Sequence, residues 1–251
     1  MASVNEKMTA IANEIRAKTG GEEKLNLDQM ASSIDEVYEA GYEKGELTFW
    51  EEYLKNGSRT NFQYSFAGIG WTDNTFKPNR NLMVKASSYM FHGSLITNLK
   101  ALTEKLGITI DFSQCTSFTY TFGNANITDI GVVDVRSTSV SLQYFAYNSK
   151  GLKNFEKLIV NENNVFSSTA FQGTDNLVEI RFEGVIGKNG LNLQWSKKLS
   201  HDSLVSIIDC LQDKSGDTSG TEWVVKVGTD NCAKLTEEDL SKIQKKGWFF
   251  I

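Results

Sequence analysis

Three short segments share one pattern, and their spacing restricts the fold more than any other feature of the sequence. Each has an apolar residue, two mostly polar positions and a second apolar residue: Ile127–Ile130, Leu152–Phe155 and Leu177–Ile180. Both the first and the last residues recur every 25 positions. A period in the twenties with such a core is typical of leucine-rich repeats, in which each unit buries its apolar side against the next. The spacing therefore predicts a solenoid.

Further apolar positions extend the pattern on both sides of each segment. Phe122, Phe145 and Phe171 precede the three segments, and we expect these rings to fill the space between neighbouring units. An ordinary β-rich domain with chance spacing is the alternative, but two sets of anchors at the same spacing favour repeats. The trailing apolar pairs, of which the third is shifted by one residue, are Val133 and Val135, Leu158 and Val160, and Phe182 and Val185.

Composition excludes several classes of function. The net charge of −5 and the pI of about 5.2 argue against nucleic-acid binding, which needs a basic surface. The sequence contains no apolar run of membrane-spanning length, and its N-terminus lacks the apolar core of a signal peptide. Cys115, Cys210 and Cys232 are odd in number and far apart, which predicts reduced, buried thiols in a protein made in a cytoplasm.

The N-terminal 46 residues are predicted to form two short amphipathic helices, one over residues 4–17 and one from Asp28 onward. Short helices depend on tertiary packing for stability. We therefore expect residues 1–46 to become ordered only by self-association or by docking to a neighbouring protein, as an attachment segment. The apolar stripes that would make these contacts are Met8, Ile11 and Ile15 on the first helix and Met30, Ile34 and Val37 on the second.

The rest of the chain is predicted to form a solenoid over residues 47–190 and an α/β capping unit over 191–251. Residues 46–56 would form a helix that covers the open end of the solenoid. Phe91-His92-Gly93 would open the first repeat, in which a helix over 95–106 would precede a strand at 108–112. In the capping unit a helix begins at Ser200 and a strand covers 223–227. A capping box at Thr236–Asp239 opens a second helix before a last strand at 248–251. The predicted fold class is α+β.

Several stretches resemble a known family. The segments with their Phe-x-Gly openings resemble the BspA-like leucine-rich repeats of bacterial surface proteins and of phages that infect Gram-positive bacteria. Residues 11–20 and 24–30 look like a leader common in phage tail and baseplate proteins. Residues 199–204 and 246–248 are similar to the ending of phage-encoded leucine-rich-repeat proteins. The resemblance implies a structural protein of a virion, made in the cytoplasm of the bacterial host, and trimeric as is usual for tails.

The sequence offers little for catalysis. His92 and His201 lie in different modules, the cysteines form no Cys-x-x-Cys pair, and no hydrolase or nucleotide-binding motif occurs. We therefore expect no enzyme, cofactor or metal. Binding is the stronger hypothesis, because a solenoid displays aligned side chains from successive units. The candidates are a row of hydrogen-bonding residues, Asp129, Asn154 and Glu179, and the aromatic residues Tyr120, Tyr144 and Tyr147, which could stack on sugars or pack between units.

The leading hypothesis is therefore a non-catalytic protein of the phage tail or baseplate. Its repeats would bind a glycan or protein of the host surface, and its N-terminal helices would bind other virion proteins. Two alternatives stay open. One is an architectural decoration of the head or baseplate, whose repeats contact other virion subunits. The other is an enzyme that degrades the cell wall, since two carboxylates can meet across a fold without leaving a sequence signature.

Overall fold

The computed structural model describes residues 60–63, 65–67, 80–136 and 141–251. Residues 58–251 form one compact α+β unit. The two predicted N-terminal helices, the six attachment residues on them, and the predicted helix over 46–56 lie outside the described residues. Within the described part of the chain, no helix is long and apolar enough to cross a membrane.

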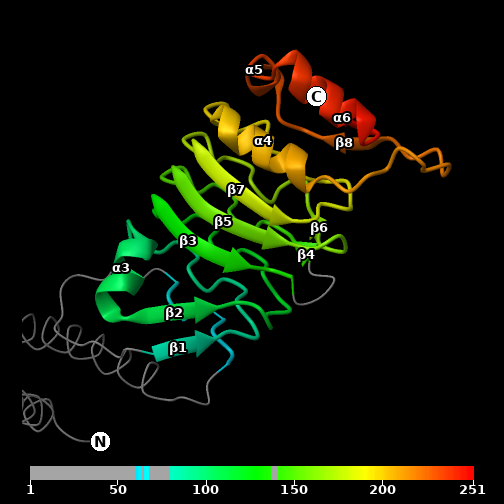
Figure 1. Ribbon diagram of the computed structural model, residues 1–251. Helices are drawn as coiled ribbons and strands as arrows, with labels where there is room; N and C mark the ends of the chain where they lie inside the picture. The colour runs from blue at the N-terminus through cyan, green and yellow to red at the C-terminus, as the bar shows by residue number, and fades with distance from the viewer. Residues whose placement is uncertain (1–59, 64, 68–79, 137–140) are drawn as a thin grey trace, which may run out of the picture. The chain divides into compact units, whose positions relative to one another are not determined.

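A three-stranded parallel sheet forms the centre of the described unit. Its strands are β3 (Asp129–Asp134), β5 (Asn154–Val160) and β7 (Glu179–Gly184), in the order β3-β5-β7. They lie side by side in Figure 1. Ile130 is opposite Phe155, and Phe155 is opposite Ile180. The 25-residue spacing of the sequence is thus the register of this sheet.

The apolar residues of the three segments form the core, as predicted. The first and last residue of each segment is buried, and Phe155 and Ile180 are fully buried. The three predicted aromatic residues, Phe122, Phe145 and Phe171, are also fully buried. The Phe155 ring lies 6.3 Å from that of Phe122 and 6.0 Å from that of Phe145, measured between centroids. Fully burying one such side chain contributes roughly 1.5–3 kcal/mol.

The third segment differs from the first two at its trailing apolar pair. The register shifts between Phe155 and Leu158, so that Val160 lies opposite Gly184. Gly184 has a φ of +100°, and a Cβ there would lie 2.0 Å from the Val160 carbonyl oxygen, so only glycine fits. Past this irregularity Val185 points outward and Ile186 is buried in its place.

Three smaller parallel pairs accompany the central sheet. β1 (Arg80–Met83) pairs with β2 (Ile108–Asp111), and β4 (Ser141–Leu142) pairs with β6 (Val165–Phe166). Near the C-terminus β8 (Trp223–Val225) pairs with β9 (Trp248–Phe250). These strands confirm the predicted strands that begin at residues 108, 223 and 248.

One helix lies beside each outer strand of the central sheet (Figure 1). α3 (Leu99–Leu106) lies beside β3 and begins after Asn98, whose side-chain oxygen accepts a hydrogen bond from the Ala101 N–H. The predicted start at Leu95 was four residues too early. α4 (His201–Cys210) lies beside β7 and has Ser200 as its N-cap, as predicted.

A C-terminal helix packs against α4. α6 (Glu237–Lys245) begins with the predicted capping box between Thr236 and Asp239. The short helix α5 (Thr229–Cys232) was not predicted. The Lys246 ammonium donates 2.9 Å hydrogen bonds to three carbonyl oxygens at the end of α4, those of Ile208, Asp209 and Leu211. This lysine therefore supplies hydrogen-bond donors to carbonyl groups at that helix end.

Candidate functional site

The predicted hydrogen-bonding row is brought together by the sheet. Asp129, Asn154 and Glu179 stand directly opposite one another on β3, β5 and β7. The Asn154 amide donates to Asp129 Oδ1 at 2.6 Å, and the Thr128 hydroxyl donates to Asp129 Oδ2 at 2.7 Å. Hydrogen bonds from Asn154, and then from Thr128, lower the pKa of Asp129. Glu179 Oε2 accepts from the Ser200 hydroxyl at 2.8 Å. Several of the hydrogen bonds of this row therefore join neighbouring segments of the protein and are made within the fold.

The predicted tyrosines also come together, but chiefly with one another. The Tyr120 ring is stacked between Tyr89, at a centroid distance of 5.1 Å, and Tyr144, at 4.5 Å. Tyr147 meets both Tyr120 and Tyr144 edge to face. Both faces of the Tyr120 ring are therefore covered, and no face is left for a sugar. For Tyr120 the geometry favours packing between neighbouring turns of the chain.

The repeat predicted to open at Phe91 contains a fourth copy of the core pattern, Ile96–Leu99. The Thr128 N–H donates to the Thr97 carbonyl, just as the Lys153 N–H donates to the Thr128 carbonyl. Ile96 and Leu99 are buried like their counterparts. The spacing from Ile96 to Ile127 is 31 residues, six more than the regular 25. After Leu99 the chain continues as α3, where the later segments continue as a strand.

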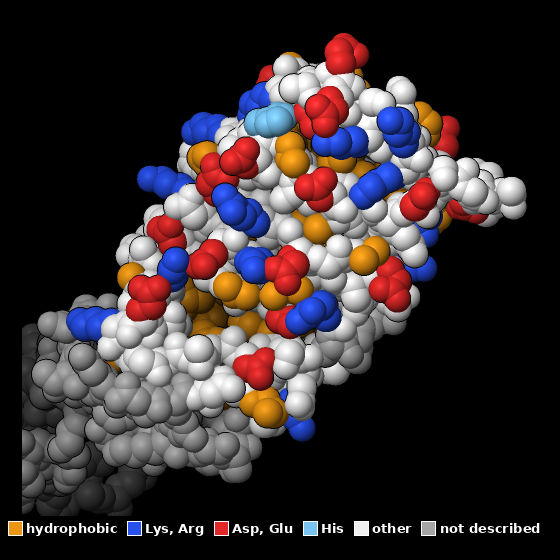
Figure 2. Space-filling view, viewed as in Figure 1, with side chains coloured by type: hydrophobic (Ala, Val, Ile, Leu, Met, Phe, Trp, Pro, Cys, Tyr) orange, Lys and Arg blue, Asp and Glu red, His pale blue; other side chains and the backbone are white. Residues whose placement is uncertain are grey.

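This helix keeps β2 away from β3, and a cleft results. β2 pairs with β1. Among the described residues β3 pairs only with β5, apart from one isolated bridge between Asn98 and Asp129. The cleft between β2, α3 and β3 has a volume of about 500 Å³. Figure 2 shows it as a hollow with an apolar interior among charged side chains.

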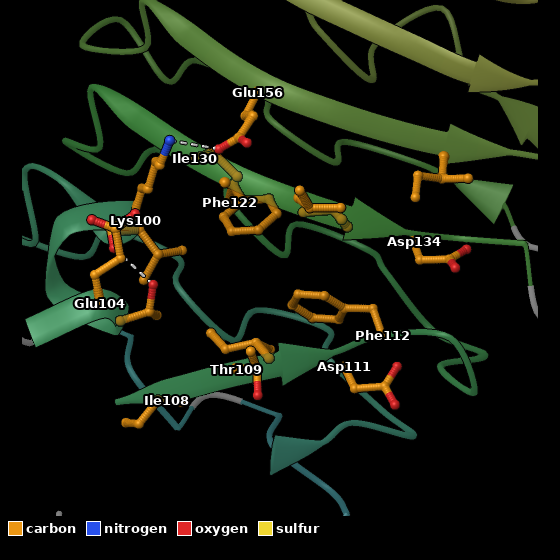
Figure 3. A pocket seen from close by; sticks show the side chains of 17 residues that line it. Lys100, Glu104, Ile108, Thr109, Asp111, Phe112, Phe122, Ile130, Asp134 and Glu156 are labelled. Carbon is orange, nitrogen blue, oxygen red and sulfur yellow. Dashed lines mark hydrogen bonds and ion pairs between the residues drawn. The ribbon is translucent and has the colours of Figure 1, made fainter. Parts of the chain in front are cut away.

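The cleft has an apolar floor and an acidic rim (Figure 3). At the α3 end lie Glu104 and the ion pair between Lys100 and Glu156, whose charged atoms are 2.9 Å apart. Asp111 and Asp134 lie at the opposite end. Burial opposes ionisation of Asp134, but hydrogen bonds from Arg136 outweigh it and lower its pKa. The apolar lining residues are Leu99, Ile108, Ile110, Phe112, Phe122, Ile130, Val132, Val133 and Ile159.

The lining suits binding of a ligand. Its polar side chains are carboxylates, one lysine and the hydroxyls of Thr103 and Thr109. The Thr103 hydroxyl donates to the Lys100 carbonyl of its own helix at 2.8 Å. A volume of this size, an apolar floor and a few polar groups are the usual properties of ligand sites. Among the residues that the structure describes, no group of three or more His, Cys, Asp and Glu is placed to hold a metal ion.

The histidines and cysteines lie outside the cleft. His92 packs edge to face on Tyr89 and Tyr120. His201, in the first turn of α4, has its Nε2 2.8 Å from Asp239 Oδ2. All three thiols are free, and Cys232 is only half-buried, whereas Cys115 and Cys210 are buried. Burial raises the pKa of Cys210 to about 11, so that this thiol is protonated at neutral pH.

Comparison with family models, with curated proteins and with solved structures gives no match to this chain.

Proposed function

We propose that this protein is a non-catalytic binding protein whose ligand site is the cleft between β2, α3 and β3. The observation that carries the proposal is the cleft itself, a hollow of about 500 Å³ with an apolar floor and an acidic rim. The row at Asp129 and the stack at Tyr120 are engaged in internal contacts, as described above. The cleft is the concave surface that these contacts leave open to a ligand.

The scaffold that presents the cleft is proposed to be a leucine-rich-repeat solenoid of the BspA-like kind. Its support is the in-register parallel pairing of segments 25 residues apart and their buried apolar anchors. The fourth segment at Ile96–Leu99 adds to this support. In such a solenoid the cleft is the place where an insertion of six residues interrupts the regular stacking.

The biological setting is proposed from the resemblance of residues 11–30 and of the chain's end to phage proteins. The protein would be a component of a phage tail or baseplate, localised in the virion. Residues 1–46 would attach it to other virion proteins or to copies of itself, with a trimer as the expected form. The cleft would then bind a component of the host surface.

A substitution at Gly131 tests the binding role of the cleft. Gly131 lines the cleft, and a Cβ added there would make only ordinary contacts at 3.9–4.0 Å with the Lys100 side chain. Gly131→Val should therefore fill space in the cleft without disturbing the fold. The matched control is Gly216→Val, since a Cβ at Gly216 meets nothing within 4 Å.

The measurement is binding of fluorescently labelled protein to cells of bacterial strains that phages with this gene infect. Wild type and Gly216→Val should bind, and Gly131→Val should bind at least tenfold less. Equal binding by all three proteins would place the ligand site elsewhere. Absence of any cell binding, together with firm binding to purified particles, would favour the architectural alternative.

Particle assembly tests the setting separately. Deletion of residues 1–46 should leave a soluble, folded and monomeric protein that is missing from purified particles, as judged by mass spectrometry of the particles. Incorporation of the truncated protein would refute the attachment role of this segment. Failure of the truncated protein to fold would show that the segment belongs to the core of the repeat domain.

A further inference from the structure

Two strand edges border the cleft. Every strand of a parallel sheet has backbone N–H and C=O groups on both of its edges. β2 uses one edge to pair with β1, and β3 uses one edge to pair with β5. Their other edges face the cleft. Within the described part of the chain no strand pairs with either of them there, and one isolated bridge, from Asn98 to Asp129, occupies the start of the β3 edge. Such an edge is a template for one more strand.

The dimensions and the lining of the cleft match an extended peptide. β2 has four residues and β3 has six, so the shorter edge spans roughly 13 Å, the length of about four extended residues. Side chains of a strand alternate between its two faces. Every second side chain of an added strand would therefore face the apolar floor, which includes Phe112 and Phe122. The remaining side chains would face outward, toward the charged rim.

The charge of the rim determines which peptides the cleft favours. Glu104, Asp111, Asp134 and Glu156 supply four carboxylates to the lining, and Lys100 supplies the one ammonium group. Lys100 is already paired with Glu156, and hydrogen bonding to Glu156 raises the pKa of Lys100. Asp134 is likewise paired with Arg136, so Glu104 and Asp111 are the lining carboxylates that no ion pair within the described residues offsets. An acidic rim attracts basic side chains and repels acidic ones.

We infer that the cleft binds an extended polypeptide segment in which apolar residues alternate with Lys or Arg, added as a strand along the edges of β2 and β3. This inference rests on the proposed role of the cleft as the ligand site and names its ligand. In this mode main-chain hydrogen bonds provide affinity, and the pockets for alternate side chains provide specificity. The ligand is thus a protein segment, which is one of the two ligand classes, glycan and protein, expected from the sequence.

The probe is a library of capped, fluorescently labelled hexapeptides that alternate Val, Ile, Leu or Phe with Lys or Arg. A second library has Asp or Glu at the charged positions. Binding to the full chain is measured by fluorescence anisotropy at low and at physiological salt. Members of the basic library should bind and members of the acidic library should not, and binding should weaken as salt screens the rim.

Modified peptides and protein variants then locate the bound peptide. N-methylation of alternate amides along one edge of the best binder removes backbone donors and should weaken binding about tenfold or more. Gly131→Val should weaken it at least as much, while Gly216→Val should not. Glu104→Lys reverses a rim charge and should weaken binding of the basic peptide. Its matched control is Glu162→Lys, at an exposed position outside the lining of the cleft.

Thermal melting of each variant separates loss of binding from loss of the fold, and Glu104→Lys provides the test if Gly131→Val unfolds. Absence of any basic binder, equal binding by the acidic library, or indifference to N-methylation would each overturn the inference. If Gly131→Val abolishes binding to cells while no peptide binds, the proposed function stands and the peptide ligand is wrong. If cells and peptides both bind regardless of Gly131, both proposals fail.

Discussion

The two outer strands of the central sheet each have a helix beside them, yet one edge is closed and the other is open. At β7, the Ser203 and Ser206 hydroxyls of α4 accept hydrogen bonds from the backbone N–H groups of Ile180 and Phe182, at 3.0 and 3.2 Å. At β3, the helix is α3, and its Thr103 hydroxyl donates to the Lys100 carbonyl of the same helix. A cleft of about 500 Å³ borders this second edge.

The difference shows that a helix can end a parallel sheet in two ways. α4 buries Leu204, Ile207 and Ile208 and also supplies hydroxyl groups to the neighbouring strand, so it replaces both the packing and the hydrogen bonds of a further strand. α3 buries only Leu99 and Leu106 and leaves the strand edge to another partner. An unpaired edge is a liability for aggregation unless it has a partner or protection. Retention of an open edge therefore fits a surface with a binding role.

The largest expected effect is at Phe155, in the central strand β5, which pairs with both outer strands. Phe155→Ala removes a fully buried ring that contacts Phe122 and Phe145, and should lower the free energy of unfolding by roughly 3–5 kcal/mol. Urea denaturation followed by circular dichroism measures this change. Because β5 lies between β3 and β7, both edges should lose order together. An unchanged melting temperature would contradict the packing of the three segments.

The second effect is at the closed edge. Ser203 is fully buried, and its hydroxyl accepts from the Ile180 N–H. Ser203→Ala leaves this buried donor unsatisfied and should destabilise the protein by about 1–3 kcal/mol. Hydrogen exchange should show faster exchange of the Ile180 amide in this variant. Unaltered stability and exchange would mean that α4 closes the edge by packing alone.

The corresponding change at the open edge should have a much smaller effect. Thr103→Ala removes a hydroxyl that bonds only within its own helix, and alanine has the higher helix propensity. The free energy of unfolding should change by no more than about 0.5 kcal/mol in either direction. A loss as large as that of Ser203→Ala would show that Thr103 supports β3 and that the two edges are alike.

The regular part of this architecture could be predicted from sequence because equal spacing requires equal register. The 25-residue spacing places Ile130, Phe155 and Ile180 in one row across the sheet, and their burial follows from their position on its inner face. The capping box at Thr236 was equally readable, because it depends only on local hydrogen bonds. The hydrogen bond from Asn154 to Asp129 could not be read in this way, and packing at Tyr120 could be foreseen only as one of two alternatives. Both depend on side-chain orientations across turns that lie more than 20 residues apart.

The cleft was missed because its sequence signal has two interpretations. Ile96 and Leu99 are three positions apart, which satisfies both the core pattern of the segments and one turn of an amphipathic helix. The repeat that opens at Phe91 was predicted, but reading Ile96 and Leu99 as helix hid its core segment and the six extra residues that follow from the 31-residue spacing. The sequence signal for the site was the 31-residue spacing from Ile96 to Ile127, which departs from the 25-residue spacing of the segments that follow.

A further expected effect concerns a contact between α6 and α4, a brace behind the closed edge. Asp239 of α6 caps its own helix through Thr236 and also lies 2.8 Å from His201 of α4. Burial opposes ionisation of this carboxyl, but hydrogen bonds from Thr236 and His201 outweigh it and lower the pKa of Asp239 from 3.8 to about 2. A depressed pKa in the folded state stabilises the protein above the pKa of the unfolded chain. This contribution should be complete above about pH 5 and disappear as the pH falls from about 4 through about 2.

Asp239→Asn tests this brace, because asparagine cannot ionise. The variant should melt below wild type at pH 7, and the difference in melting temperature should shrink between pH 4 and pH 2. Glu238→Gln is the matched control, since Glu238 stands in the same helical turn but is exposed and pairs only with Lys242. Its melting temperature should stay close to that of wild type, because an exposed pair of this kind contributes little. A difference between wild type and Asp239→Asn that is constant from pH 7 to pH 2 would show that the carboxylate charge plays no part in holding α6 against α4. Closure of the β7 edge would then depend on the serines and the buried face of α4 alone.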